Sequence, residues 1–209
     1  MTDALQSSRL LIVLSGPSGA GKTVLTRQLR SVATDLYFCV TATTRDPRPG
    51  ERDGIDYHFL SRDEFTRRIG VNGFLEWARV PPPDGPYYGT PIAEVERAFR
   101  NEQDAFLQVD VQGAASVRSL VPSAVTIFLR PASVDALRGR VQLRGTEGEA
   151  EMERRLENAR LELDREVEFD YAVVNQNGRL DEAVARVCDI IVRERAARLI
   201  DDAPTRQRS

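Results

Sequence analysis

Short apolar runs recur along the chain and alternate with segments of helical periodicity. Leu10–Leu14 is the first such run, and a glycine-rich turn and a predicted helix over Lys22–Ala33 follow it. Runs of similar length occur at Phe106–Asp110, Val125–Leu129 and Tyr171–Val174. Buried parallel strands are nearly continuous apolar stretches separated by helices, so the pattern predicts an α/β fold with a mainly parallel sheet.

The pattern changes between residues 38 and 90. Two short strand-like pieces, Phe38–Thr41 and Tyr57–Leu60, flank the turn-rich segment Asp46–Gly50, and Ser61–Ile69 is the one clear helical stretch. Such a segment between core strands is typical of an inserted lobe. We therefore expect a single domain over residues 1–200. Its core is expected at 9–37, 91–130 and 168–200, and its lobe at 38–90.

Helical patterns dominate the last third of the chain. One helix is predicted over Val134–Leu143, the segment Arg144–Glu147 interrupts the pattern, and Glu149–Val167 resumes it with many charged residues. A final helix is predicted over Leu180–Leu199. The polar tail, residues 201–209, is expected to be disordered.

Composition excludes several classes of protein. The chain has 209 residues, enough for one domain with a sizeable core. Its 29 basic and 32 acidic residues give a net charge of −3, which is not typical of a nucleic-acid binder. No apolar run is long enough to span a bilayer, and residues 1–8 lack the features of a signal peptide. We therefore expect neither nucleic acid nor a membrane as a partner.

The few cysteine and histidine residues limit the chemistry further. Cys39 and Cys188 lie far apart without metal-ligand spacing, and two thiols in a reducing compartment are the simplest interpretation. The only histidine, His58, stands in the apolar-flanked stretch Tyr57–Leu60, and we interpret it as a strand residue without a catalytic role. A cytoplasmic protein is expected.

A phosphate-binding motif follows the first predicted strand directly. The segment Gly16–Thr23 fits the pattern G-x-x-x-x-G-K-[ST] in the strand-to-helix setting that this motif requires. Its glycines let backbone N–H groups turn toward phosphate oxygens at the positive end of the next helix. Lys22 can reach the β- and γ-phosphates, and the Thr23 hydroxyl can hold Mg²⁺. The candidate ATP-binding residues here are Gly16, Ser18, Gly19, Ala20, Gly21, Lys22 and Thr23.

Lys22 is unusual in this composition. Of the 29 basic residues 28 are arginine, and Lys22 is the only lysine. A single lysine placed at random among those positions would fall on this one about 3% of the time. A compact ammonium fits between phosphates where the planar fork of an arginine does not. The phosphate-binding motif and the bias toward arginine at the other basic positions together predict a nucleotide site. The motif alone indicates only a large superfamily.

The lobe carries residues suited to a second phosphate and to a base. Arg45 and Arg48, with the phenols of Tyr57 and Tyr88, can grip a phosphate monoester through forked and single hydrogen bonds. Glu76 lies in an apolar setting, and its two acceptor oxygens suit the adjacent N1–H and N2–H₂ donors of guanine. Adenine lacks that donor pair. The lobe therefore indicates a guanine nucleotide as the phosphoryl acceptor.

These segments resemble guanylate kinases. The resemblance rests on Thr43–Glu51, which reads T-T-R-x-P-R-x-G-E, on Phe74–Trp77 and on Tyr87–Thr90, and it extends over nearly the whole chain. It implies a P-loop kinase fold with a three-layer core, an inserted GMP-binding lobe at 38–90 and a mobile helical lid at about 138–160. The implied reaction is ATP-dependent phosphorylation of GMP to GDP with Mg²⁺.

The same resemblance implies roles for individual residues. The implied catalytic residues are Lys22, Arg45, Arg144 and Arg155, and the ATP side gains Arg140 from the lid and Asn175 near the adenine. Positive charge in a lid suits phosphoryl transfer between two polyanions, but arginines that alternate with glutamates can also form an ordinary solvated helix face. The implied GMP site consists of Thr41, Arg45, Arg48, Tyr57, Glu76, Tyr88, Thr90 and Asp110.

Three departures from the family pattern concern the acceptor. Gln108 stands where the family usually has an acidic residue, so only Asp110 remains on that face of the strand. Thr41 replaces the usual serine, and the proline-rich loop Val80–Pro86 is slightly longer than typical. Gln108 and this loop leave open a related kinase acting on another or modified nucleoside monophosphate. A non-catalytic binding module is a further alternative, and monomer and homo-oligomer both stay open.

Overall fold

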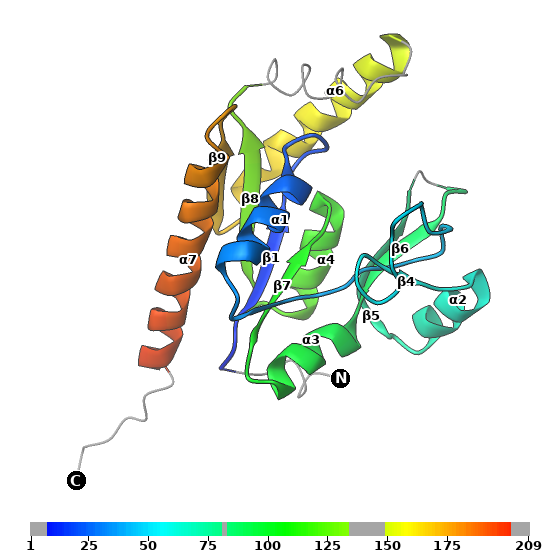
Figure 1. The fold of residues 1–209 in the computed structure, drawn as a ribbon. Helices are drawn as coiled ribbons and strands as arrows, with labels where there is room; N and C mark the ends of the chain where they lie inside the picture. The colour runs from blue at the N-terminus through cyan, green and yellow to red at the C-terminus, as the bar shows by residue number, and fades with distance from the viewer. Residues whose placement is uncertain (1–7, 81–82, 134–148, 202–209) are drawn as a thin grey trace.

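The computed structural model describes residues 8–80, 83–133 and 149–201 and shows a core and a lobe (Figure 1). The core contains a five-stranded sheet in the order β2-β7-β1-β8-β9, in which every neighbouring pair is parallel. This confirms the mainly parallel α/β core predicted from the apolar runs. The strands are β1 (Leu11–Ser15), β2 (Leu36–Phe38), β7 (Asp104–Gln108), β8 (Val125–Pro131) and β9 (Tyr171–Asn175).

Helices cover both faces of this sheet. They are α1 (Lys22–Val32), α3 (Ile92–Arg100), α4 (Val111–Leu120) and α7 (Leu180–Asp201). On β1, Ile12 packs with residues of α1 and α7, and its neighbour Val13 packs with residues of α3 and α4. Successive strand side chains point to opposite faces, so a strand covered on both sides is apolar at every position. The layers are helices, sheet and helices.

The lobe is a second, four-stranded sheet with one helix packed against it. Its order is β4-β3-β6-β5, in which only the β3–β4 pair is parallel. Phe65 of the helix is fully buried, and its ring lies 4.3 Å from that of Phe74 and 5.1 Å from that of Tyr87, between centroids. The lobe thus has a small core of its own. Its elements are β3 (Ala42–Thr43), β4 (His58–Phe59), α2 (Arg62–Gly70), β5 (Phe74–Arg79) and β6 (Tyr87–Pro91).

Glu94 of α3 joins the core to the lobe. Its Oε2 accepts from the Val40 N–H at 2.7 Å and from the Tyr37 hydroxyl at 3.1 Å. Its Oε1 lies 3.1 Å from Nε2 of His58 in β4. These contacts satisfy a carboxylate that is almost completely buried, which would otherwise be costly. The prediction that His58 is a strand residue is confirmed, and its ring contributes to this joint.

The C-terminal part closes the core. The helix α6 (Glu149–Asp164) continues into a 3₁₀ turn over Arg165–Glu168, so the predicted helix over 149–167 ends earlier than expected. The turn leads into β9, and α7 then lies on the side of the core opposite the lobe (Figure 1). The predicted helix over 134–143 and residues 202–209 lie outside the described residues. Across the described ranges, no helix combines the length and apolarity needed to cross a bilayer.

Boundaries near the lobe differ from the sequence prediction. The predicted strand Phe38–Thr41 is wrong beyond its first residue, because Phe38 ends β2 in the core sheet, residues 39–41 form a connection, and Ala42 begins β3 in the lobe sheet. The strands β5 and β6 and the helices α3 and α4 have no counterpart among the predicted elements. The lobe strands are short and turn-flanked, so their identity depends on pairing between distant segments more than on local periodicity.

Candidate active site

The phosphate loop connects β1 to α1 at the carboxyl end of the central strand. Gly16, Gly19 and Gly21 have φ angles of 138°, 82° and 97°, a region that favours glycine. A Cβ on Gly16 would also lie 2.1 Å from the carbonyl oxygen of Leu129, so a side chain does not fit there. Gly21 is the N-cap of α1 and provides no side-chain cap, which leaves the first N–H groups of the helix pointing toward an anion site.

Lys22 and Asn175 both bond to this loop. The Lys22 ammonium donates to the carbonyl oxygens of Gly16 at 2.5 Å and Pro17 at 3.1 Å. Nδ2 of Asn175, at the end of β9, donates to the carbonyl oxygen of the fully buried Ala20 at 2.8 Å. Asn175 is itself only 5% exposed. The Asn175 amide thus supports the phosphate loop. Its place near the adenine, which the resemblance implies, stays a prediction.

A carboxylate of the chain itself lies against the phosphate loop. Oε2 of Glu162, in α6, accepts from the backbone N–H of Ser18 at 3.2 Å. Burial raises the pKa of Glu162, while the Ser18 N–H and the charge of Lys22 act in the opposite direction. Glu162 thus stands where a phosphate oxygen is expected. It is 144 positions from Ser18 in sequence, and no local pattern around Glu162 indicates this contact.

Thr23 and Gln108 form the part of the site where Mg²⁺ is expected. Oε1 of Gln108 accepts from the Thr26 hydroxyl at 2.8 Å, and its Nε2 donates to Oγ1 of Thr23 at 3.4 Å. Thr23 keeps an oxygen lone pair, which fits a metal ion that is held mainly by nucleotide phosphates and water. In the described part of the chain, no three His, Cys, Asp or Glu side chains are grouped as a metal site.

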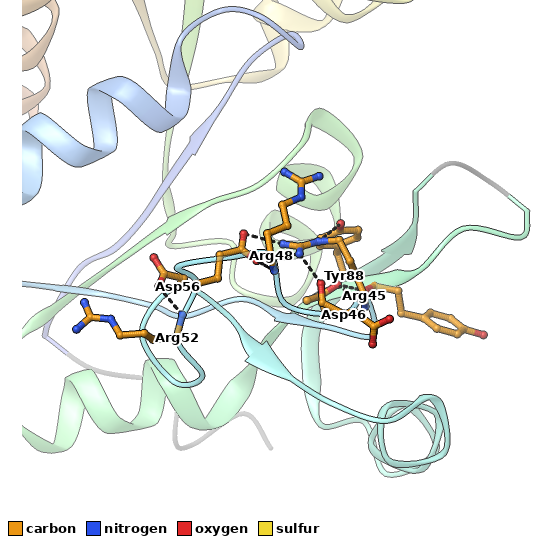
Figure 2. A network of polar contacts seen from close by, with 9 residues as sticks. Arg45, Asp46, Arg48, Arg52, Asp56 and Tyr88 are labelled. Atoms are coloured by element: carbon orange, nitrogen blue, oxygen red, sulfur yellow. Dashed lines mark hydrogen bonds and ion pairs between the residues drawn. The ribbon is translucent and has the colours of Figure 1, made fainter. Parts of the chain in front are cut away.

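Arg45 is the centre of a polar network in the lobe (Figure 2). Its Nε donates to the Tyr88 hydroxyl at 3.3 Å, and its guanidinium carbon lies 5.1 Å from the ring centroid of Tyr57. The two tyrosine rings are 6.1 Å apart. Burial raises the pKa of Tyr57, so its phenol stays protonated and can donate to a phosphate. The structure thus brings together three of the four residues predicted to bind a phosphate monoester.

Glu51 also belongs to this network, although it was not among the residues predicted to bind phosphate. Its carboxylate accepts from Nη1 and Nη2 of Arg45 at 2.8 and 3.0 Å and from the backbone N–H of Arg48 at 2.7 Å. The Arg48 side chain, the fourth predicted phosphate ligand, is exposed and extends away from Arg45 (Figure 2). The signal for Glu51 was its place at the end of the T-T-R-x-P-R-x-G-E segment.

Glu76 of β5 is half-buried where the lobe meets α4. Its Oε1 accepts from the Thr90 hydroxyl at 2.7 Å, and a Cβ on Gly113 of α4 would lie 3.1 Å from its Oε2. Burial raises the pKa of Glu76 to about 7; the Thr90 hydrogen bond opposes this shift and the charge of Asp110 adds to it. At and above neutral pH this carboxylate can therefore offer two acceptor oxygens in a confined space.

Asp110 lies between the two sides of the site. It is the N-cap of α4, and its Oδ1 accepts from the Gly113 N–H at 2.7 Å. Its charge raises the pKa of both Glu76 and Glu162, in each case after the larger effect of burial. Gln108 turns instead to the threonines of α1. The prediction that both residues lie on one face of a strand is therefore wrong, because β7 ends at Gln108 and Asp110 caps the following helix.

The remaining predicted residues are less informative. Thr41 precedes β3 and is half-buried, and its carbonyl oxygen accepts from the His58 N–H at 2.9 Å. Arg140 and Arg144 of the predicted lid lie outside the described residues. Arg155 falls within α6, but its side chain is outside what the structure describes.

Comparison with known proteins agrees with this arrangement. Residues 8–194 match the sequence model of the guanylate kinase family. The chain is 44% identical over 190 residues to the guanylate kinase of Desulfitobacterium hafniense (strain Y51), covering 91% of this chain and 92% of that protein. Identity to the guanylate kinase of Bacillus subtilis (strain 168) is 43% over 183 residues, which cover 87% and 85%.

A solved structure extends the agreement to three dimensions. The crystal structure of guanylate kinase from Anaplasma phagocytophilum is similar with a TM-score of 0.70 at 28% identity, covering 92% of this chain and 89% of that one. The sequence match spans the phosphate loop, the whole lobe and the strands and helices of the core. This chain therefore belongs to the guanylate kinase family.

Proposed function

We propose that this protein transfers the γ-phosphoryl group of ATP to GMP, forming ADP and GDP. The observation that carries the proposal is the pairing of a phosphate loop in the core with a half-buried carboxylate, Glu76, and an arginine–tyrosine cluster in the lobe. A nucleotide kinase needs places for the donor phosphates, the acceptor phosphate and the acceptor base. The relatives at 43–44% identity carry the name of this activity.

On the donor side, the loop amides and the N-terminus of α1 bind the phosphates of ATP. Glu162 must leave the Ser18 N–H before a phosphate oxygen can take its place. Lys22, which bonds to loop carbonyls in this structure, then turns to the β- and γ-oxygens.

Thr23 would hold Mg²⁺, and Gln108 fixes the orientation of its hydroxyl. When bound, Mg²⁺ neutralises phosphate charge and helps to align the reacting groups. We propose that Arg140, Arg144 and Arg155 supply further positive charge at the transferring group.

On the acceptor side, Glu76 accepts from N1–H and N2–H₂ of guanine, with Thr90 holding one of its oxygens in place. The two arginines, Arg45 and Arg48, contact the acceptor phosphate together with the phenols of Tyr57 and Tyr88, and Arg45 already lies beside both phenols. Thr41 and Asp110 complete the proposed GMP site. An oxygen of the GMP phosphate attacks the γ-phosphorus of ATP, and the bond to the ADP oxygen breaks, with no covalent enzyme intermediate.

Neither rival function gains support from a feature of the site. Gln108, which motivated a different acceptor, bonds to threonines on the donor side, whereas Glu76 bonds to Thr90. The phosphate loop has the backbone geometry of a working anion site, which argues against a module that binds no nucleotide. We also propose a cytoplasmic location, which the two free thiols, Cys39 and Cys188, support.

The test is ADP release measured with ATP, Mg²⁺ and a panel of GMP, AMP, CMP and UMP. We expect kcat/KM for GMP to exceed that for AMP by at least about 10³-fold, because AMP leaves the Glu76 carboxylate without its donor pair. Glu76→Gln, which keeps the size of the side chain, should narrow this ratio by roughly tenfold or more. If GMP is not among the best acceptors, the proposed function is wrong.

A further inference from the structure

Glu51 stands at the centre of the acceptor phosphate site without being one of its predicted ligands. It and Arg45 are mostly covered, with side-chain exposures of 21% and 16%. The carboxylate takes both terminal nitrogens of Arg45, and the carbonyl oxygen of Asp46 accepts from Nη1 at 2.7 Å. With Nε bonded to Tyr88, four of the five N–H groups of Arg45 are used inside the protein. At most one is left for a ligand.

The same carboxylate also closes the turn that carries Arg48. Glu51 accepts the Arg48 N–H at 2.7 Å, and its own N–H donates to the Arg48 carbonyl oxygen at 3.0 Å. Pro49 and Gly50 occupy the middle of this turn, and Gly50 has a φ of 89°. Proline followed by a residue with positive φ is the signature of a type II turn. Glu51 thus bonds reciprocally across a rigid turn.

We infer that Glu51 is the positioning residue of the acceptor phosphate site: it fixes the guanidinium of Arg45 and the turn bearing Arg48 before GMP arrives. The inference rests on the proposed function. Arg45 then presents its one remaining N–H beside the phenols, while Arg48, whose guanidinium extends away from Arg45, provides the fork for the phosphate (Figure 2). Arg45 can thus give the phosphate one hydrogen bond and not a forked pair.

The opposite possibility is that Glu51 is a stand-in anion that GMP displaces. Two observations favour a fixed role. The Arg48 N–H anchors the carboxylate independently of Arg45, so loss of Arg45 would not release it. If the Glu51 carboxylate left, the Arg48 N–H and two N–H groups of Arg45 would all need new hydrogen-bond acceptors. The two possibilities predict opposite signs for the effect of removing the charge.

The experiment is calorimetric titration of GMP into wild type and Glu51→Gln without ATP, with KM for GMP and for ATP measured in parallel. A glutamine has one acceptor oxygen for three N–H groups, so we expect GMP affinity to fall at least about tenfold. KM for ATP should stay within about twofold, because the phosphate loop is untouched. GMP binding that is unchanged or tighter in Glu51→Gln would overturn the inference.

Asp56→Asn is the matched control. Asp56 lies in the same segment and its Oδ2 accepts the Arg52 N–H at 2.8 Å, but it does not touch Arg45 or the Arg48 turn (Figure 2). GMP affinity should change by less than about twofold in this variant, because Asp56 bonds to the Arg52 N–H and to neither arginine of the phosphate site. The variant is matched to Glu51→Gln because it also loses one negative charge and alters one backbone contact. An equal loss in both variants would show that general loop disruption is responsible and would contradict the inference.

A double-mutant cycle with Arg45→Gln tests the route of the effect. If Glu51 acts mainly through Arg45, Glu51→Gln should weaken GMP binding much less in the Arg45→Gln background than in wild type. Additive losses would refute positioning through Arg45. Should Glu51→Gln not fold at 25 °C, Glu51→Asp keeps the charge but shortens its reach, and it must show the same pattern of weakened GMP and unchanged ATP binding. Wild type that does not phosphorylate GMP would refute the proposed function instead.

Discussion

The donor and acceptor sites each hold a carboxylate of the chain itself, but in different ways. At the phosphate loop, Glu162 makes one 3.2 Å hydrogen bond to one amide, and it comes from a helix distant in sequence. In the lobe, Glu51 accepts three shorter hydrogen bonds from residues within six positions of it. The single hydrogen bond of Glu162 is easily broken, whereas the hydrogen bonds of Glu51 are part of a turn. An anion at the first site can therefore be exchanged for a phosphate, whereas the second stays in place.

The cations at the two sites, Lys22 and Arg45, also differ in how firmly the protein holds them. Lys22 is a point charge on a flexible stem, and it bonds to loop carbonyls from which it can turn. Arg45 carries a planar guanidinium, and its Nε and both Nη atoms already donate hydrogen bonds inside the protein. The donor site thus rearranges around a phosphoryl group that moves, and the acceptor site is prepared for a phosphate that must be held still.

The largest expected effect comes from replacing the lysine of the phosphate loop with an arginine. Lys22→Arg should lower kcat for GMP phosphorylation by roughly 10²-fold or more, because a planar guanidinium cannot follow the transferring group between the loop carbonyls and the phosphates. Turnover is measured by ADP release, and thermal unfolding checks that the fold is kept. Arg27→Lys, an exposed exchange on the same helix, should leave turnover within about twofold. Unchanged turnover in Lys22→Arg would contradict the role that we assign to the Lys22 ammonium.

A smaller effect is expected from pH on the acceptor side. The pKa of Glu76 is about 7, and only its carboxylate accepts both guanine donors. The protonated fraction grows as pH falls, so KM for GMP should rise below pH 7 and approach a tenfold increase per unit below about pH 6. KM should be nearly constant above pH 8. Steady-state rates between pH 5.5 and 8.5 measure this.

Glu76→Gln is the control for the pH dependence. Its KM for GMP should be higher at pH 8 and should change with pH only through the second ionisation of the GMP phosphate, near pH 6. The same steep profile in both proteins would show that the titrating group is not Glu76.

The smallest effect is expected at the displaceable carboxylate. Glu162→Gln should tighten ATP binding by about two- to fivefold, because it removes a negative charge that competes with phosphate for the Ser18 N–H. Titration calorimetry without GMP measures the affinity. Asp164→Asn removes an exposed charge from the same helix and should change it less. Weaker ATP binding in Glu162→Gln would mean that Glu162 supports the loop and does not compete for it.

The sequence predicted local chemistry better than contacts between distant segments. The phosphate loop was predictable because the positive φ angles of Gly16, Gly19 and Gly21 and the ammonium of Lys22 follow from eight consecutive residues. The core strands were predictable because a strand buried on both faces is apolar throughout. Glu51 belonged to a recognisable segment, but its bonds to Arg45 depend on a turn whose geometry the letters alone do not give.

Other features arise only from tertiary packing. Glu162 reaches Ser18 across 144 positions, and Glu94 links the core to His58 of the lobe across 36. The raised pKa of Glu76 requires the burial that α4 and β5 create together. The hydrophobic pattern of a single segment does not indicate these contacts, because each contact depends on how two distant segments are placed relative to each other.

The most direct test of the contrast between the sites is a crossed calorimetric titration. ATP and GMP are titrated separately into wild type, Glu162→Gln and Glu51→Gln. The account predicts opposite signs: ATP binds more tightly to Glu162→Gln, GMP binds at least about tenfold more weakly to Glu51→Gln, and each variant keeps its affinity for the other nucleotide within about twofold. Tighter GMP binding to Glu51→Gln would contradict it, because the lobe carboxylate would then be a displaceable anion like the one at the donor site.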